Sequence, residues 1–472
     1  MTEGARESAA EAPRVAASLL FKAIELLPGD APERHHLRLE ATTYQVHGGL
    51  VREAAATARR VLAGPHPAEL GSRFRIVLIA ALIGQARMAE VEAEATQGLA
   101  GNGLAEPEQR YFFGLRSWAR VRQGFLSEAE SDARQALVGG AQLVKDPPSA
   151  IAVNTLAELA HLRGDPQRAV ELTRAGLAER GPQGGMRFPE QYPLAIWQGL
   201  ALLDLDQTEE AMQVLRDGLA EVDRTVFALQ APLFHGAIAW AHFLGGRWDD
   251  AVTEIWSGLD HSRRTAAGVD RNTERLLAII RLLRGERDAM QQAGRLLEAL
   301  HAEDGRLGLS DLRLRSLLLE LGGDPERAAI SLRQAWDLGE RAGIRHLVAW
   351  MVPDVLRLAR LSPSSEPAPA IVGPLVPAVQ DLSRRWNSTT VTAAACLARG
   401  VRDGNAASLA RAVRLYRSSP RRTDRAFGLE ECAFAMLALG HPEQALGPLR
   451  EALDIYLSVR AMPSVERVAS EI

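Results

Sequence analysis

A glycine-to-alanine spacing of five residues recurs along this chain and constrains its fold more than any other feature. The pairs are Gly49/Ala54, Gly84/Ala89, Gly124/Ala129, Gly164/Ala169, Gly246/Ala251, Gly323/Ala328 and Gly440/Ala445. Asp206/Ala211 has aspartate in the glycine position, and Ala289 follows Gly285 by four residues. Gly84, Gly124 and Gly164 lie 40 residues apart, which sets the period. Internal repeats of this length indicate a solenoid of stacked supersecondary units.

Two further columns of small residues keep a fixed spacing from these alanines. Seven residues after the alanine lie Ala136, Gly176, Gly218, Gly258, Ala335 and Ala452, and twelve before it lie Ser117, Ala157, Gly199, Ala239, Ser316 and Ala433. Packed helices approach closely only where side chains are short. Glycine adopts a left-handed conformation cheaply, so each repeat glycine is expected to end the first helix of a pair. The pattern predicts antiparallel helix pairs throughout.

These columns resemble the tetratricopeptide repeat, and Ala16, Ala23 and Pro28 fit the second helix of such a repeat. The resemblance implies an all-α fold, a right-handed superhelical solenoid of tetratricopeptide-like antiparallel helix pairs with a period near 40 residues. The tetratricopeptide period is about 34 residues and the HEAT period about 40 to 47, so HEAT-type pairs are the structural alternative. The three small columns favour the tetratricopeptide interpretation.

Composition and charge exclude several classes of protein. A formal net charge of -4 gives no electrostatic footprint for nucleic acid, so we expect no direct nucleic-acid binding. Two cysteines, Cys396 and Cys432, cannot form a disulfide framework and are expected in the core of a cytoplasmic protein. The longest apolar run, Ile76 to Ile83, is too short to span a membrane, and residues 1–12 lack the apolar segment of a signal peptide.

Proline divides the chain into four expected segments. We expect a flexible N-terminus over residues 1–13, helical repeats over 14–361, a proline-rich interruption with a distorted helix over 362–388, and C-terminal repeats over 389–472. Five prolines between Leu361 and Gln380 should break a continuous helix there. A long inter-repeat loop is expected at Gly181 to Gly185.

Segments near the two ends of the chain resemble one particular family of repeat-containing proteins. Residues 16–41 and 440–468 are similar to the start and end of the sensor region of large ATP-binding LuxR-type and MalT-like transcriptional regulators. In that family the region senses a signal and docks proteins, while flanking domains bind ATP and DNA. Here neither Lys22 nor Lys145 follows a glycine, so we expect no P-loop in these residues and no helix-turn-helix domain after Ile472. We expect either an excised sensor module of such a regulator or a stand-alone scaffold that binds a peptide or protein.

Catalysis and metal binding have little support in the sequence. HExxH, Cys-x-x-Cys and Gly-x-Ser-x-Gly motifs are all missing, so we expect no enzyme, no cofactor and no metal site. His235 and His242 lie seven residues apart on one helical face, and we interpret them as packing residues because further metal ligands cannot be identified. A third class, an enzyme built on a helical toroid, lacks an acid/base pair.

The concave groove of the superhelix is the better candidate site, because the first helix of each pair lines it. Inner positions fall 18, 15, 11 and 8 residues before the repeat alanine. They give the candidate binding residues Tyr111, Trp118, Asn154, Glu158, His161, Trp240, Phe243, Arg271, Glu274 and Arg281. Trp118 and Trp240 share one repeat position, and Gly114 and Gly236 share another that should leave space beside each indole.

An aromatic floor with a few polar groups suits a small-molecule effector or a protein or peptide partner. The alternative is that a tight superhelix fills its own axis, so that these aromatics are core residues. Oligomerisation stays open.

Overall fold

The computed structural model describes residues 1–9, 11–101, 104–137, 144, 146–178, 192–223, 230–265, 271–304, 308–362 and 367–472. These residues form 25 α-helices and no β-strand. The helices of the N-terminal half are α1 (Thr2–Ser8), α2 (Pro13–Leu26), α3 (Glu33–His47), α4 (Val51–Ala63), α5 (Ala68–Gly84), α6 (Met88–Leu99), α7 (Glu106–Gln123), α8 (Leu126–Ala136), α9 (Pro147–Leu162), α10 (Pro166–Ala178), α11 (Tyr192–Asp204) and α12 (Thr208–Asp223). Those of the C-terminal half are α13 (Ala231–Leu244), α14 (Trp248–Thr265), α15 (Arg271–Arg284), α16 (Ala289–Asp304), α17 (Leu309–Leu321), α18 (Pro325–Ala342), α19 (Val348–Leu361), α20 (Pro367–Arg385), α21 (Thr389–Asp403), α22 (Ala406–Ser418), α23 (Arg422–Ala438), α24 (Pro442–Val459) and α25 (Met462–Ala469).

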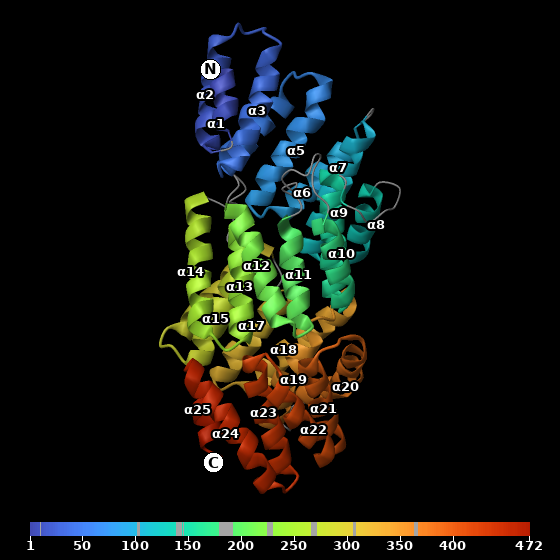
Figure 1. The fold of residues 1–472 in the computed structure, drawn as a ribbon, viewed down its shortest axis with the longest axis vertical. Helices are drawn as coiled ribbons and strands as arrows, with labels where there is room; N and C mark the ends of the chain where they lie inside the picture. Colours follow the sequence, from blue (N-terminus) through green and yellow to red (C-terminus); the bar gives the residue numbers. More distant parts are fainter. Residues whose placement is uncertain are drawn as a thin grey trace.

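Successive helices pack as antiparallel pairs, for example α7 with α8, α13 with α14 and α17 with α18. The first helix of a pair also contacts the first helix of the next pair, as α7, α9, α11 and α13 do in turn. Figure 1 shows the pairs stacked along the long axis, with the N-terminal repeats at one end and α19 to α25 at the other. The prediction of an all-α solenoid of tetratricopeptide-like helix pairs is confirmed.

The repeat glycines end their helices as predicted, with one exception. Gly124, Gly164 and Gly246 have φ values of 84°, 73° and 71°, the left-handed region that favours glycine. In the second pair, however, α5 runs through Gly84, and Ala86 takes the left-handed conformation with φ 57°. The buried residue five positions later is Val91, whereas Ala89 is exposed near the start of α6, so the pairing Gly84/Ala89 is shifted by two residues.

The small columns mark close helix contacts. A Cβ atom on Gly176 would lie 2.7 Å from Leu194 Cδ1, and one on Gly199 would lie 2.5 Å from Leu215 Cγ. Real Cβ contacts are essentially never this short. The glycines are therefore required because a leucine of a neighbouring helix occupies the space of a side chain.

The N-terminus differs from the expected flexible segment over residues 1–13. Residues Thr2–Ser8 form α1, and Ala5 is fully buried in a small core shared with α2 and α3. The Arg6 guanidinium donates hydrogen bonds of 2.8 Å and 3.0 Å to the Glu40 carboxylate of α3. These contacts hold the segment in place as a helix.

The proline-rich stretch is helical for most of its described length. Helix α20 begins at Pro367 and continues through Pro374 and Pro377 to Arg385. Its apolar face, including Val376 and Val379, is fully buried in the main core. Burial of this face offsets the backbone hydrogen bonds that proline removes. Residues 363–366 and the expected loop at Gly181 to Gly185 lie outside the described residues.

The chain returns on itself, so that α19 to α25 dock against the turns of earlier repeats. Hydrogen bonds of 2.9, 3.0 and 3.2 Å join Trp386 Nε1 to the Gly164 carbonyl, Trp248 Nε1 to Thr423 Oγ1, and Arg284 Nε to the Val459 carbonyl. The last two bonds each join residues 175 positions apart. This return encloses the superhelix axis with α13, α15 and α17 on one side and α19, α23 and α25 on the other.

Asp206 shows why one repeat lacks its glycine. It adopts the left-handed conformation with φ 62°, which aspartate tolerates better than most residues. Its carboxylate accepts hydrogen bonds from Ser388 Oγ at 2.9 Å and from the Thr390 backbone and hydroxyl at 2.9 and 2.8 Å. Arg421 Nε lies 2.9 Å away. The aspartate therefore ties the returning helices α21 and α23 to the turn after α11.

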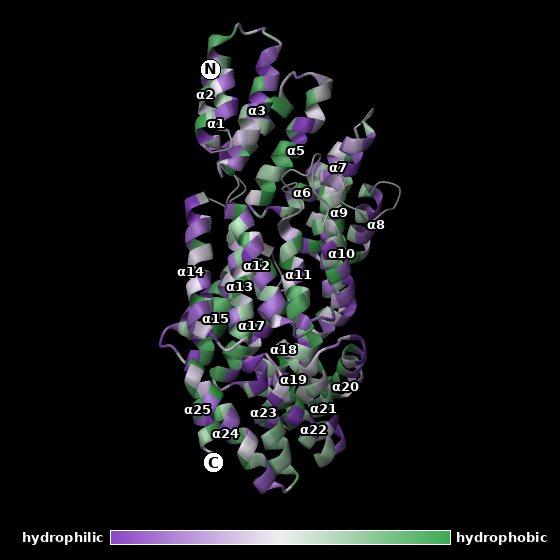
Figure 2. Cartoon of the chain, in the orientation of Figure 1, coloured by the Kyte–Doolittle hydropathy of each residue, from purple (hydrophilic) through white to green (hydrophobic). Residues whose placement is uncertain are grey.

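Apolar and polar residues alternate around the helices, as the hydropathy colouring in Figure 2 shows. Within the described ranges, no helix is both long enough and apolar enough to cross a lipid bilayer.

Candidate binding cavity on the superhelix axis

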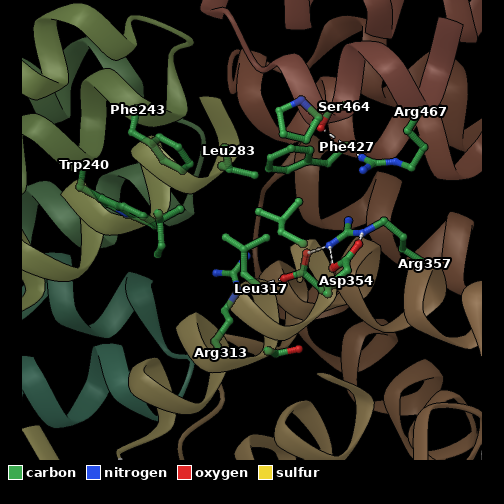
Figure 3. A pocket seen from close by; sticks show the side chains of 15 residues that line it. Trp240, Phe243, Leu283, Arg313, Leu317, Asp354, Arg357, Phe427, Ser464 and Arg467 are labelled. Atoms are coloured by element: carbon green, nitrogen blue, oxygen red, sulfur yellow. Dashed lines mark hydrogen bonds and ion pairs between the residues drawn. The ribbon is translucent and has the colours of Figure 1, made fainter. Parts of the chain in front are cut away.

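The enclosed axis contains a cavity of about 50 Å³. Its lining comes from six helices and consists of Trp240, Phe243, Ile279, Leu283, Arg313, Ser316, Leu317, Glu320, Leu321, Asp354, Arg357, Phe427, Pro463, Ser464 and Arg467. Figure 3 shows Trp240 and Phe243 facing Phe427, Ser464 and Arg467 across it. Since one water needs about 10–15 Å³ of such volume, the cavity has room for roughly four waters or one small chemical group.

The apolar wall is rigid. The rings of Trp240 and Phe243 stack with centroids 5.4 Å apart, and Trp240 also packs against Trp350 at 5.2 Å. Phe243 stacks in turn on Trp248 at 5.3 Å. The Trp248 indole donates a 3.2 Å hydrogen bond to the Phe243 carbonyl, which fixes the stack. An aromatic wall held on both sides can receive an apolar group without rearranging.

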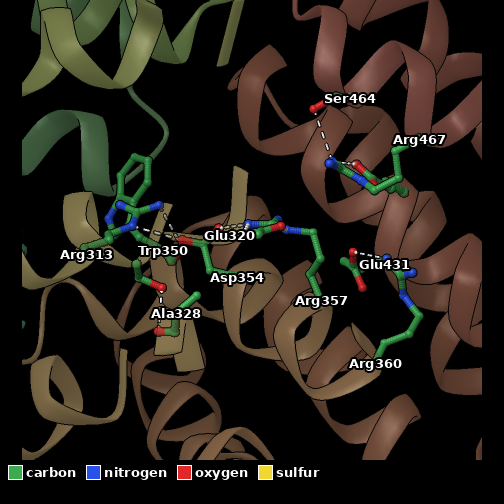
Figure 4. Close-up of polar contacts among 12 residues, drawn as sticks. Arg313, Glu320, Ala328, Trp350, Asp354, Arg357, Arg360, Glu431, Ser464 and Arg467 are labelled. Atoms are coloured by element: carbon green, nitrogen blue, oxygen red, sulfur yellow. Dashed lines mark hydrogen bonds and ion pairs between the residues drawn. The ribbon is translucent and has the colours of Figure 1, made fainter. Parts of the chain in front are cut away.

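Another part of the lining is a row of ion pairs between α17 and α19, visible in Figure 4. Arg357 donates hydrogen bonds of 2.5 and 3.0 Å to Glu320 and one of 2.9 Å to Asp354. Arg313 donates a 3.0 Å hydrogen bond to Asp354. Burial alone would raise the pKa of Asp354, but the charges and hydrogen bonds of the two arginines outweigh it and hold that pKa below its ordinary value.

A second group of buried charges lies next to the cavity, between α19, α23 and α25, and its Arg467 also lines the cavity. Arg467 donates hydrogen bonds of 2.5 and 3.0 Å to Glu430. The neighbouring Glu431 accepts a 3.2 Å hydrogen bond from Arg360. Burial raises the pKa of Glu431 to about 7, against the opposing charge of Arg360 and with the help of the Glu430 carboxylate.

This pKa predicts a pH-dependent stability. The folded pKa of Glu431 lies above the ordinary 4.5, so the stability from its neutral carboxyl is complete at acidic pH and is lost as the pH rises to about 7. Glu431→Gln cannot ionise. The free energy of unfolding of the variant minus that of the wild type should therefore rise by up to about 1.4 kcal/mol per pH unit and level off above neutrality.

Denaturant titrations at several pH values measure this difference. Glu451→Gln changes a carboxylate in a half-exposed surface pair and is the matched control, for which a much flatter difference is expected. A pH-independent difference for Glu431→Gln would contradict the assigned ionisation.

Two of the predicted site residues line the cavity, namely Trp240 and Phe243. On α15 the lining residues are Ile279 and Leu283, whereas Arg281 lies over the Trp256 ring at 6.0 Å, away from the axis. The predicted Arg271 and Glu274 are half-buried in the first turn of α15. Ala289 follows Gly285 by four residues, whereas the other repeat alanines follow their glycine by five. Inner positions of α15 counted back from Ala289 are therefore one residue out of register.

Several lining residues were missed although the repeat carries a signal for them. Arg313, Leu317 and Glu320 lie 15, 11 and 8 residues before Ala328, the offsets expected for inner positions. Phe427 lies 18 residues before Ala445. Asp354, Arg357 and Arg467 have no such signal, because α19 and α25 reach the cavity only through the return of the chain.

The other predicted residues form a separate patch on α7 and α9. Asn154, Glu158 and His161 are each at least 94% buried, since their exposed fractions are 3%, 3% and 6%. The His161 ring lies 4.8 Å from the His346 ring, and the Arg345 backbone donates a 2.7 Å hydrogen bond to the Leu162 carbonyl. Burial lowers the pKa of His346 to about 3. The segment before α19 therefore covers the His161 end of this patch.

Trp118 and Tyr111 of α7 are partly buried against the N-terminal core. Gly114 does not leave space beside the Trp118 indole, because its Cβ position would lie 3.3 Å from Ile151 Cβ. The glycine instead lets α7 and α9 approach closely. Between α9 and α13, His346 and Trp350 lie against His161 and Trp240, so the chain fills this stretch of its own axis.

The two histidines of α13 have separate partners. His235 Nδ1 lies 2.7 Å from Glu254 Oε2, and His242 Nδ1 accepts a 2.9 Å hydrogen bond from Arg247. In the described part of the chain, no three histidine, cysteine, aspartate or glutamate residues come together as a metal site would require.

Comparisons with known proteins find similarity only to solved structures of low sequence identity. No protein-family model and no curated protein matches it. A crystal structure of a Rap protein complexed with Competence and Sporulation Factor aligns with 93% of this chain and 100% of its own at 10% identity and a TM-score of 0.38. A crystal structure of the APC/C hetero-tetramer Cut9-Hcn1 aligns with 97% of this chain and 93% of its own at 10% identity and a TM-score of 0.32. At these scores neither likeness carries an argument about function.

Proposed function

We propose that this chain is a non-enzymatic scaffold that binds a peptide or protein partner and holds one apolar side chain of that partner in the axial cavity. The observation that carries the proposal is the cavity itself, where a rigid aromatic wall faces a row of ion pairs. Binding sites are typically apolar with a few convergent polar groups that fix orientation. Trp240, Phe243 and Phe427 would contact the apolar group, and Arg313 and Ser464 could donate to the carbonyls of the partner.

The charged lining supports binding rather than catalysis. A general acid or base at neutral pH works best with a pKa near 7. The two lining carboxylates, Glu320 and Asp354, are each held by Arg357, and the pKa of Asp354 is lowered. Such a row of ion pairs suits a fixed, preorganised wall.

Trp240→Ala tests this proposal. The substitution removes the aromatic floor of the cavity, so the affinity for a peptide selected on the wild-type protein should fall at least about tenfold, while the helix content stays the same. Peptide selection from a random library followed by fluorescence anisotropy and circular dichroism measures both effects.

Trp256→Ala is the matched control, because this tryptophan of α14 is 42% exposed and lies outside the cavity. Equal losses in both variants, or lost helix content in Trp240→Ala alone, would show that Trp240 acts as a core residue. Leu283→Ala is a smaller change in the cavity lining. If the cavity binds the peptide, this variant should lose affinity while its helix content stays the same.

A finer candidate is the sensor module of a LuxR- or MalT-type transcriptional regulator, with a small effector in the cavity. The repeat period near 40 residues and the similarity of residues 16–41 and 440–468 to that family favour it. A library of small polar metabolites screened by thermal shift distinguishes the scaffold from the sensor module. A metabolite should raise the melting temperature of a sensor, whereas only peptides should raise that of a scaffold.

A further inference from the structure

Arg122 of α7 lies in an aromatic and acidic setting on the inner surface. Its guanidinium carbon lies over the Trp118 ring at 5.2 Å and over the Trp197 ring at 5.5 Å. Its Nη1 lies 3.3 Å from Glu158 Oε1. Two indoles and a carboxylate around one planar cation are a recognised arrangement for binding guanidinium groups.

The same place contains unused hydrogen-bond acceptors. Asn154 and Glu158 lie one turn apart on α9 and are each 3% exposed. Among the described residues, no donor hydrogen-bonds to Asn154 Oδ1 or Glu158 Oε2. A buried acceptor without a donor costs as much free energy as a lost hydrogen bond, so native proteins rarely keep one.

Farther along the same face, the polar atoms are also incompletely satisfied. His161 Nδ1 lies 3.2 Å from Asp204 Oδ2, but the two atoms are not aligned as a hydrogen bond. Asp204 and His161 are 3% and 6% exposed. This face therefore has three groups with acceptor oxygens, those of Asn154, Glu158 and Asp204. The guanidinium of Arg122 lies beside Glu158 alone among these three.

We propose that this place is a binding site for a guanidinium side chain of the partner, which replaces the guanidinium of Arg122 between the two indoles. The inference rests on the proposed function, because it assigns an arginine to the bound peptide. The Arg122 side chain is 31% exposed and that of Glu158 is 4% exposed, so the proposal requires Arg122 to move toward solvent while Glu158 keeps its place. An incoming guanidinium has five donors, enough to satisfy Glu158 Oε2 and Asn154 Oδ1 as well.

The test uses Arg122→Met, which keeps an apolar stem over the indoles and removes the charge. Methylguanidinium chloride is the probe, and methylurea is the uncharged probe of similar shape. Methylguanidinium should raise the melting temperature of Arg122→Met in a saturable way, with at least about a tenfold lower apparent Kd than for the wild type, where Arg122 competes. Methylurea should have no saturable effect.

Two controls separate the site from a general salt effect. Arg333→Met removes the cation of a half-exposed surface pair and should show no saturable rescue by methylguanidinium. Arg122→Met combined with Glu158→Gln should lose the rescue, because the carboxylate is gone. If Arg122→Met does not fold, Arg122→Gln takes its place.

The proposal would be overturned if methylguanidinium still raised the melting temperature saturably in the variant that lacks the Glu158 carboxylate. An equal rise in melting temperature with methylurea would also overturn it. Selected peptides that bind through Trp240 but tolerate replacement of every arginine would also overturn it while leaving the proposed function intact. Saturable rescue of Arg122→Met together with unchanged peptide affinity in Trp240→Ala would instead keep the guanidinium site and remove the cavity from the proposed function.

Discussion

Replacing Arg357 by methionine is expected to lower the free energy of unfolding by about 3–5 kcal/mol. The Arg357 and Glu320 side chains are both 7% exposed, and Asp354 shares the same guanidinium. Removing this cation leaves Glu320 buried without its partner and leaves Asp354 with Arg313 alone. Chemical denaturation monitored by circular dichroism measures the loss.

Arg333→Met is the matched control for this change. Arg333 pairs with Asp337 on the surface of α18, where both side chains are 39% exposed, so its removal should cost less than about 1 kcal/mol. Adding Glu320→Gln to Arg357→Met should recover part of the loss, because the stranded carboxylate is then neutral. A loss for Arg357→Met no larger than that for Arg333→Met would mean that the ion pairs of the cavity wall are not rigidly buried.

Gly428→Ala is expected to destabilise the C-terminal repeats by about 3 kcal/mol, because a Cβ atom at this position overlaps the Tyr416 ring. Tyr416 is 1% exposed and packs in the main core, so the ring has little room to move. A Gly-to-Ala change in an unobstructed helix has the opposite sign, since alanine favours the helix by about 1 kcal/mol. Thermal unfolding of the variant measures the sum of the two effects.

Gly447→Ala supplies that comparison in the neighbouring helix α24. A Cβ atom at this position would lie 3.6 Å from Arg417 Nη2, an ordinary contact with a flexible side chain. This variant should be as stable as the wild type or more stable by up to about 1 kcal/mol. If both glycine variants changed stability in the same direction, the close approach of α22 and α23 at Tyr416 would be incorrect.

Some residues of the candidate site could be predicted from the repeat spacing, and others could not. Trp240 and Phe243 line the cavity at the offsets that the repeat alanine predicts, and the same offsets applied to Ala328 would have found Arg313 and Glu320. Arg281 was misplaced because one turn is a residue shorter, which rotates a helical face by about 100°.

The sequence by itself determined the helix pairs, most of their turns and several of their close contacts. Helical periodicity, left-handed glycines and small residues at contact points all act within one or two repeats, so their spacing is visible along the chain. Gly176 and Gly199 are required by neighbours that lie within 20 residues of them.

Only the tertiary structure decided where the superhelix closes and what its axis contains. The return of the chain joins residues 175 positions apart, and it brings Arg357 and Arg467 to a cavity whose aromatic wall comes from α13. Asp206 is an irregularity in the repeat until Ser388, Thr390 and Arg421 are seen around its carboxylate. Such contacts depend on the summed rotation of many repeats, and small changes per repeat accumulate into a position that no local pattern encodes.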